Sequence, residues 1–195
     1  MKRRLLSVVP FVLFLCFAGF HADAITRTAV ASGNFNTAST WSPAGVPADG
    51  DVLIIGSPYN VTMDVASAGY YPNYHITINN GGTLTRSGNF AVNGGGSSIT
   101  INAGGTLSVS AKLTINQTTL TITGGEVTAQ SFEASAGTVT VNAGGELNVS
   151  AKLTINQSTL NIASGEVTAQ SFDTSGTINL ASGKLTITNE LKVNG

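Results

Sequence analysis

A repeat of 40 residues dominates the second half of the chain. Residues 107–133 and 147–173 are identical at 21 of 27 aligned positions, without a gap. They share the strings Val-Ser-Ala-Lys-Leu-Thr-Ile-Asn-Gln and Gly-Glu-Val-Thr-Ala-Gln-Ser-Phe. A fixed period of this size indicates an architecture in which each unit packs on its neighbours. We therefore assign a double repeat to residues 107–146 and 147–186.

Each 40-residue repeat divides into two shorter units with a common plan. A unit holds an alternating apolar triplet, one or two glycines, a further apolar residue and a third apolar triplet. The units begin at Ile76, Ile99, Leu120, Val139, Leu160 and Ile178. Residues 52–75 form a degenerate earlier unit, whose apolar positions we take to be Val52, Ile54, Val61 and Met63. The chain therefore predicts about seven units of 18–24 residues.

Apolar and polar residues alternate inside a unit. The residues expected on one face of the unit that begins at residue 99 are Ile99, Ile101, Leu107, Val109, Leu113 and Ile115. Serine, threonine and asparagine occupy the other face. This period of two, rich in β-branched residues, is typical of strands, and the glycines in every unit disfavour helices.

Three short strands per unit predict one coil of an all-β fold, the parallel β-helix or β-solenoid. Coils stacked about 4.8 Å apart supply backbone hydrogen bonds and a continuous core that no single coil can form. We expect a right-handed solenoid, because parallel crossover connections are right-handed. A β-sandwich is the alternative, although it would not need a near-identical repeat of 40 residues.

The first 24 residues have the pattern of an export signal. Basic residues at positions 2–4 precede an apolar stretch, Leu5–Phe20, and Ala22 and Ala24 are the small residues that a signal peptidase reads. The apolar stretch is shorter than the roughly 20 residues that span a bilayer. We therefore predict a signal peptide over residues 1–24, cleavage after Ala24, and a mature chain that is secreted or on the outer cell surface and has no membrane span.

Composition narrows the classes of partner. Charged residues make up 10% of the chain, and the formal net charge is −1. A nucleic-acid-binding protein would carry a basic patch or stripe, so we expect no nucleic-acid partner. The single cysteine, Cys16, lies in the predicted signal peptide, which leaves the mature chain without disulfides.

The segment from residue 33 to residue 64 resembles a known module. In order, it contains Gly33-Asn34-Phe35, Trp41-Ser42-Pro43, Val46-Pro47, Gly50-Asp51-Val52, Ile54-Ile55-Gly56 and Val61-Thr62-Met63-Asp64. This order is similar to the opening of the eight-glycine domain family and to the N-terminal module of secreted Bacteroidota surface proteins. The resemblance implies a right-handed β-helix after the opening and an association with cell-surface carbohydrate.

The residues before the first coil are expected to protect it. A terminal coil has an unpaired edge that could recruit other strands. We therefore assign residues 25–51 to an N-terminal cap and residues 52–195 to the solenoid. Residues 191–195 complete a strand pattern with no capping segment after it, so we expect either continuation in a longer surface protein or end-to-end self-association through the uncapped last coil.

Aromatic side chains are the candidate ligand-binding residues. Trp41 is interpreted either as part of the cap or as a platform for a ligand. Tyr70, Tyr71 and Tyr74 cluster within seven residues and suit contact with sugars or proteins, or packing on the first coils. No residue is assigned a catalytic role.

One predicted column of side chains is rich in carboxylates. Alignment of the units places six residues in this column, Thr83, Thr106, Glu126, Glu146, Glu166 and Lys184. The three glutamates would lie roughly 5 Å apart on adjacent coils. We consider two interpretations, a Ca²⁺ site and a solvated turn whose side chains splay apart.

These features favour a non-catalytic, adhesin-like module that binds an extracellular polysaccharide or another cell-surface component. The alternative is the N-terminal part of a carbohydrate-active enzyme, either a polysaccharide lyase or a hydrolase. Outward threonine and asparagine columns, such as Thr100 with Asn102 and Thr121 with Thr123, offer a lesser alternative, an ice-binding protein.

Overall fold

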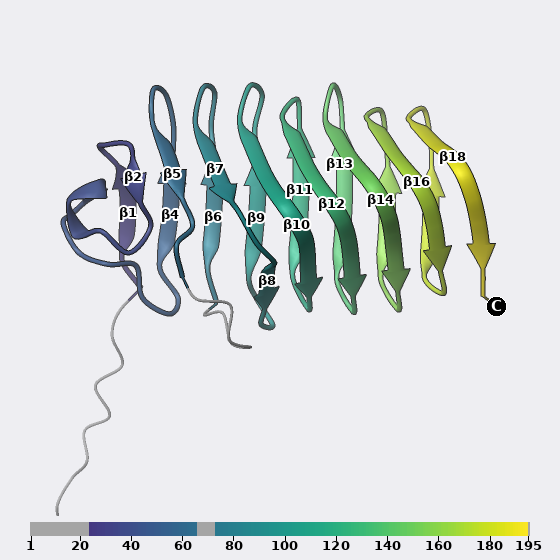
Figure 1. Cartoon of the computed structure of the whole chain (residues 1–195), viewed down its shortest axis with the longest axis horizontal. Coiled ribbons are helices and arrows are strands. Elements are labelled where there is room, and N and C mark those ends of the chain that lie inside the picture. Colours follow the sequence, from purple (N-terminus) through teal and green to yellow (C-terminus); the bar gives the residue numbers. More distant parts are fainter. Residues whose placement is uncertain (1–23, 66–72, 195) are drawn as a thin grey trace, which may run out of the picture.

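The protein is a rod built from two parallel β-sheets (Figure 1). The computed structural model describes residues 24–65 and 73–194. The chain alternates between the sheets, so that each coil adds one strand to each of them. The β-solenoid of about seven turns predicted from the sequence is confirmed.

The short-strand sheet consists of β1 (Thr26–Ala29), β3 (Trp41–Ser42), β4 (Val52–Ile55), β6 (His75–Ile78), β9 (Ser98–Ile101), β11 (Thr119–Thr123), β13 (Thr138–Asn142), β15 (Thr159–Ile162) and β17 (Thr177–Leu180). The long-strand sheet consists of β2 (Gly33–Asn34), β5 (Asn60–Thr62), β7 (Thr83–Arg86), β8 (Phe90–Asn93), β10 (Thr106–Asn116), β12 (Glu126–Ser135), β14 (Glu146–Asn156), β16 (Glu166–Thr174) and β18 (Lys184–Val193). A 3₁₀ turn, Ala38–Thr40, precedes β3.

The core lies between the two sheets. The six residues expected to face inward in the coil from residue 99 are all buried, which confirms the period of two. Equivalent residues stack in register on neighbouring coils, as Leu107 does on Leu84 and Val127. Each coil therefore contributes apolar area to one continuous core, and burial of that area is the main stabilising term.

The inward residues of the earliest predicted unit differ from the expectation. Val61 and Met63 are buried, but Val52 and Ile54 face outward and are half-buried, whereas Leu53 and Ile55 point inward. Four consecutive apolar residues have no alternation that could fix the phase of the strand. The phase is set by pairing with β6, which places Leu53 beside Ile76 and Ile55 beside Ile78.

Within residues 24–65 and 73–194, the expected third strand of a coil is a separate strand at one place. β7 and β8 are distinct, with Ser87-Gly88-Asn89 between them, and both pair with β10. From β10 onward the second and third strands merge into one long strand, because no glycine or proline interrupts them. A register shift inside each long strand marks the place where the sequence predicts that the second strand ends and the third begins.

Glycine is required where the chain passes from the short-strand sheet to the long-strand sheet. A Cβ atom built at Gly125 would lie 2.5 Å from the carbonyl oxygen of Asn102 on the preceding coil. Gly145 repeats this geometry, with a Cβ position 2.6 Å from the carbonyl oxygen of Ile122. The glycines of the sequence pattern therefore allow consecutive coils to approach at hydrogen-bonding distance.

The N-terminal segment both extends the solenoid and closes it. β1 and β2 pair in parallel with β4 and β5 as a further rung. The chain then turns back, and β3 pairs antiparallel with β1 at the end of the short-strand sheet. Phe35 packs edge-to-face on Trp41 and on Tyr74, with ring centroids 5.5 and 5.4 Å apart. These aromatic contacts close the N-terminal end of the core.

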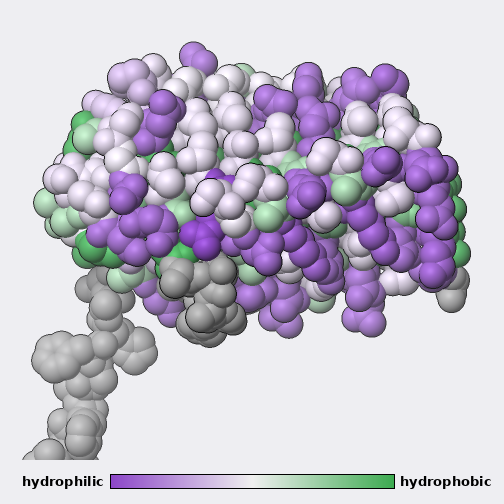
Figure 2. Space-filling view, in the orientation of Figure 1, coloured by the Kyte–Doolittle hydropathy of each residue, from purple (hydrophilic) through white to green (hydrophobic). Residues whose placement is uncertain are grey.

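Large apolar side chains are exposed chiefly at the two ends of the rod. They are Ile25, Val30 and Val46 near the N-terminal end and Leu180, Leu191 and Val193 on the last rung. Figure 2 shows the same distribution, with hydrophobic residues gathered toward both ends of the visible face.

Candidate functional site

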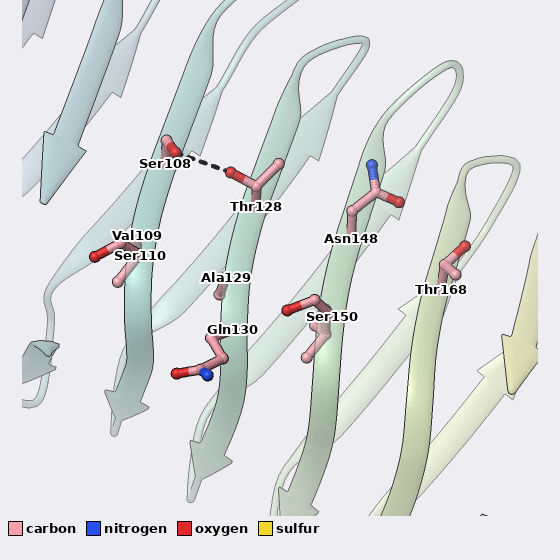
Figure 3. A pocket seen from close by; sticks show the side chains of 10 residues that line it. Ser108, Val109, Ser110, Thr128, Ala129, Gln130, Asn148, Ser150 and Thr168 are labelled. Atoms are coloured by element: carbon pink, nitrogen blue, oxygen red, sulfur yellow. Dashed lines mark hydrogen bonds between the residues drawn. The ribbon is translucent and has the colours of Figure 1, made fainter. Parts of the chain in front are cut away.

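A shallow groove crosses the outer surface of the long-strand sheet (Figure 3). It encloses about 540 Å³ and runs across four neighbouring strands, β10, β12, β14 and β16. Its lining consists of Ser108, Val109, Ser110, Thr128, Ala129, Gln130, Asn148, Val149, Ser150 and Thr168. Because the strands lie perpendicular to the rod, the groove follows the rod axis.

The groove lies where each long strand changes register. Between Val109 and Lys112, β10 has two residues, whereas β12 has the single residue Gln130 at the same level. The same mismatch recurs between β12 and β14 and between β14 and β16. An extra residue of this kind is a β-bulge, which bends a strand and redirects its side chains. The bend forms the hollow in an otherwise regular sheet.

The groove is lined by two polar rows above buried apolar residues. Val109, Ala129 and Val149 lie beneath the groove, and their side chains are almost fully buried in the core. One polar row consists of Ser108, Thr128, Asn148 and Thr168, in register on successive strands. Within this row the Thr128 hydroxyl donates a hydrogen bond to Ser108 Oγ at 3.1 Å.

The second polar row is exposed. It consists of Ser110, Gln130 and Ser150, whose side chains follow one another on successive strands along the groove (Figure 3). Among the described residues, no hydrogen-bond partner is recorded for the side chains of this row. These hydroxyl and amide groups can therefore donate to, and accept from, a ligand.

Ion pairs flank the groove on the side of the second row. Lys112 on β10 pairs with Glu133 on β12, and Lys152 on β14 pairs with Asp173 on β16, with 3.0 Å between Nζ and Oδ2. The hydrogen bond from Lys152 lowers the pKa of the Asp173 carboxyl below its usual value. Exposed pairs of this kind contribute little to stability. Their main consequence is a charged rim beside an uncharged groove.

The predicted carboxylate column forms the opposite rim. Strand register places Thr83, Thr106, Glu126, Glu146, Glu166 and Lys184 in one line, as expected. The Asn148 amide donates to Glu126 at 3.2 Å and to Glu146 at 3.3 Å, and Lys184 donates to Glu166 at 2.7 Å.

The cation interpretation of this column is not supported. Within residues 24–65 and 73–194, no group of three or more His, Cys, Asp or Glu side chains is arranged to hold a metal ion. The strands hold the glutamates in a line, and a line of side chains does not converge on one point. Asn148 and Lys184 instead satisfy the carboxylates individually.

The interpretation of Trp41 as a ligand platform is wrong. Its side chain is 1% exposed and donates a hydrogen bond from Nε1 to the carbonyl oxygen of Phe35 at 2.9 Å. Both its ring faces and its polar atom are therefore used inside the cap.

Tyr74 is also part of the cap and not of an exposed binding surface. It is 4% exposed and packs on Phe35, and burial, with the charges of Asp51 and Asp49, raises its pKa to about 12. The other two tyrosines of the predicted cluster, Tyr70 and Tyr71, lie outside the described residues.

The predicted threonine and asparagine columns lie on the outer face of the short-strand sheet. Their amides bond from coil to coil, as Asn102 does to Asn79 at 2.8 Å and Asn179 to Asn161 at 2.7 Å. These bonds link consecutive rungs.

Sequence reasoning did not find the groove. The available signal was the length difference between Val-Ser-Ala-Lys in one unit and Ala-Gln-Ser in the next, at the same place in the pattern. Such a difference predicts a bulge, but only the strand register shows that the bulges of β10 and β14 lie at the same level.

The fold and the groove define the class of the protein as a parallel β-solenoid with an uncharged axial groove. No protein-family model, curated protein or solved structure matches the chain. In the part of the chain that the structure describes, no helix has the length and apolar character of a membrane span.

Proposed function

We propose that the protein is a non-catalytic, secreted or cell-surface module, adhesin-like in role, that binds carbohydrate in the groove of the long-strand sheet. The observation that carries this proposal is the lining of the groove. Each of its ten residues is uncharged, and seven of them bear a hydroxyl or amide group.

This lining suits a neutral sugar. Sugar hydroxyls both donate and accept hydrogen bonds, as serine, asparagine and glutamine side chains do. Val109, Ala129 and Val149 also line the groove, but their side chains are buried in the core, so the exposed serine and glutamine side chains make the expected contacts. Bridging water contributes in shallow polar sites nearly as well as a direct bond. A ligand of this class also agrees with the partner that the resemblance of residues 33–64 implies.

The same lining argues for binding without catalysis. General acid–base catalysis needs a side chain that titrates within reach of the reacting bond, and glycoside hydrolysis usually needs two carboxyl groups. The lining contains neither carboxyl nor imidazole groups. The nearest carboxylates of the ion-paired rim, Glu133 and Asp173, are held by lysines. The alternative, that the chain is part of a carbohydrate-active enzyme, predicts that product forms from a bound glycan.

We expect purified residues 25–195 to bind neutral glycans on an array without releasing new reducing ends from them. Replacing Ser150 with leucine fills the groove with an apolar side chain and is expected to weaken binding about tenfold or more. The matched control is Thr140→Leu, an outward position on the short-strand sheet, which should leave binding unchanged.

Two results would overturn the proposal. Equal losses from Ser150→Leu and Thr140→Leu would show that the groove is not the site. Product formation from a bound glycan, retained after repurification, would show that the chain is an enzyme or part of one.

A further inference from the structure

The chemistry of the groove repeats on every second strand. Ser110 on β10 is followed by Gln130 on β12, and Ser150 on β14 follows in turn. The buried residues beneath the groove alternate in the same way, from Val109 to Ala129 to Val149. This alternation is the structural form of the 40-residue repeat, which contains two unlike coils.

The repeat distance along the groove follows from the strand spacing. Neighbouring strands lie about 4.8 Å apart, so equivalent side chains recur about every 9.6 Å along the rod axis. A straight polymer that lies in the groove meets one serine-bearing coil and one glutamine-bearing coil in each such interval. It can make the same contacts repeatedly only if its own chemistry alternates with a similar period.

From this repeat distance we infer that the groove accepts a neutral, extended, β-1,4-linked glycan that lies along the rod axis. Successive sugars in such a chain face opposite ways, so its chemistry repeats every two sugars, and each sugar advances by a length close to one rung. An α-1,4-linked chain curves into a helix, so it cannot follow a straight groove over several sugars. The inference rests on the proposed function and specifies its ligand.

The rims argue against an anionic glycan. Carboxylates stand on both sides of the groove, Glu126 and Glu146 on one side and Glu133 and Asp173 on the other. The lysines on the second side are already paired with carboxylates. A polysaccharide of uronic acids would therefore meet like charges along each edge.

The test is calorimetric titration of residues 25–195 with oligosaccharides of defined linkage. The β-1,4-linked series are cello-, manno- and chito-oligosaccharides of two, four and six sugars, and maltohexaose is the α-1,4-linked comparison. Because the groove crosses four strands, we expect affinity in at least one β-1,4-linked series to rise about tenfold from two to four sugars and then to level off. Maltohexaose and oligogalacturonate should bind about tenfold more weakly than the matching hexasaccharide.

A pair of variants tests whether the glycan binds in the groove. Gln130→Ala removes an exposed amide from the groove and should lower affinity severalfold, whereas Gln117→Ala, outside the groove, should not. Equal binding of maltohexaose, or no dependence on chain length, would overturn the inference and leave carbohydrate binding standing. If no glycan binds at all, the proposed function itself fails.

A second inference concerns residue 25, which follows the predicted cleavage site. The backbone nitrogen of Ile25 donates to Asp51 Oδ1 at 2.9 Å. The other oxygen of this buried carboxylate, Oδ2, accepts from Arg27 Nε at 2.8 Å and from the backbone of Ala48 at 2.9 Å. Ile25 is also fixed through its carbonyl oxygen, which accepts from Val52 at 3.0 Å.

We propose that a signal peptidase hydrolyses the Ala24–Ile25 peptide bond, so that water converts the Ala24 carbonyl into a carboxylate and leaves Ile25 with an α-ammonium group that pairs with Asp51 and completes the cap. A charge-assisted hydrogen bond is stronger than the neutral bond that an amide makes. The other charged or titratable groups around the carboxylate are Arg27, Asp49 and Tyr74. Tyr74 stays neutral below its pKa of about 12, so it does not titrate near neutral pH.

The test compares two purified forms of residues 25–195, one with a free amine on Ile25 and one with that amine acetylated. At pH 6 the free-amine form should melt about 2–4 °C higher. Pairing raises the folded-state pKa of the amine, so this advantage is present below its unfolded pKa, near 8, and is lost as the pH rises through the folded value. Equal melting at pH 6, or a secreted product that begins at another residue, would overturn the proposal.

Discussion

Replacing Asp51 with alanine is expected to lower the free energy of unfolding by about 3–5 kcal/mol, because Arg27 would remain buried without its counter-charge. The Arg27 side chain is 9% exposed and that of Asp51 is 2% exposed. The backbone N–H groups of Ile25 and Ala48 would also lose their acceptor. For a chain of this size the loss corresponds to a fall in Tm of roughly 10 °C.

The pH dependence of stability gives a second measure of the same group. Burial by itself would raise the pKa of Asp51, but hydrogen bonds from Ala48, Arg27 and Ile25 outweigh it, and the folded pKa lies below 3.8. The stabilisation is therefore fully present above pH 3.8 and is lost as the pH falls through the folded pKa. The Asp51→Ala variant should lack this part of the acid transition.

The matched control is Asp64→Ala. Asp64 also accepts a backbone hydrogen bond, from Asn36 at 2.9 Å, but it does so at an exposed position. We expect its replacement to lower the free energy of unfolding by about 1 kcal/mol or less. Urea titrations of both variants at pH 7 make the comparison, and equal losses would show that the Arg27–Asp51 pair does not organise the cap.

The repeat made much of the fold predictable. Once the units were aligned, the inward positions followed from the period of two, and the line from Thr83 to Lys184 followed from the alignment alone. Both follow from the regular stacking of the coils, in which the alignment of one unit determines the alignment of its neighbours. The phase of β4 was not predictable in this way, because Val-Leu-Ile-Ile is apolar at every position and only pairing with β6 selects the buried pair.

The candidate groove was harder to predict because it depends on β-bulges, which interrupt the regular stacking of the strands. A bulge in one strand would only displace a side chain, whereas bulges at the same level in β10 and β14, with the unbulged β12 and β16 beside them, produce a groove. Two of the aromatic candidates, Trp41 and Tyr74, are buried in the cap, and the reason why the sequence did not reveal this is different. Trp41 and Tyr74 have polar atoms that find backbone acceptors, Phe35 and Pro47, so these rings can be buried without an unpaired donor. Residue type alone does not distinguish this packing from an exposed sugar platform.

The near-identical coils also allow one substitution to be made in two settings. Phe132 and Phe172 occupy equivalent positions in the two 40-residue repeats, and both are buried. Phe132 lies between Leu113 and Leu153, which are fully buried. Phe172 lies between Leu153 and Leu191, and Leu191 is 60% exposed on the last rung.

We expect Phe132→Ala to lower the free energy of unfolding by about 3–5 kcal/mol, the usual range for a phenylalanine replaced in a rigid core. Phe172→Ala should cost clearly less, because the last rung can collapse into the space and less of the stack depends on that coil. Urea unfolding followed by circular dichroism measures both values. Equal losses would show that the last rung is as tightly coupled as an interior one, and that stability in this rod is not a sum over neighbouring coils. A larger loss at Phe132 would show that an interior coil, packed on both sides by buried neighbours, is more tightly coupled to the stack than the coil beside the last rung.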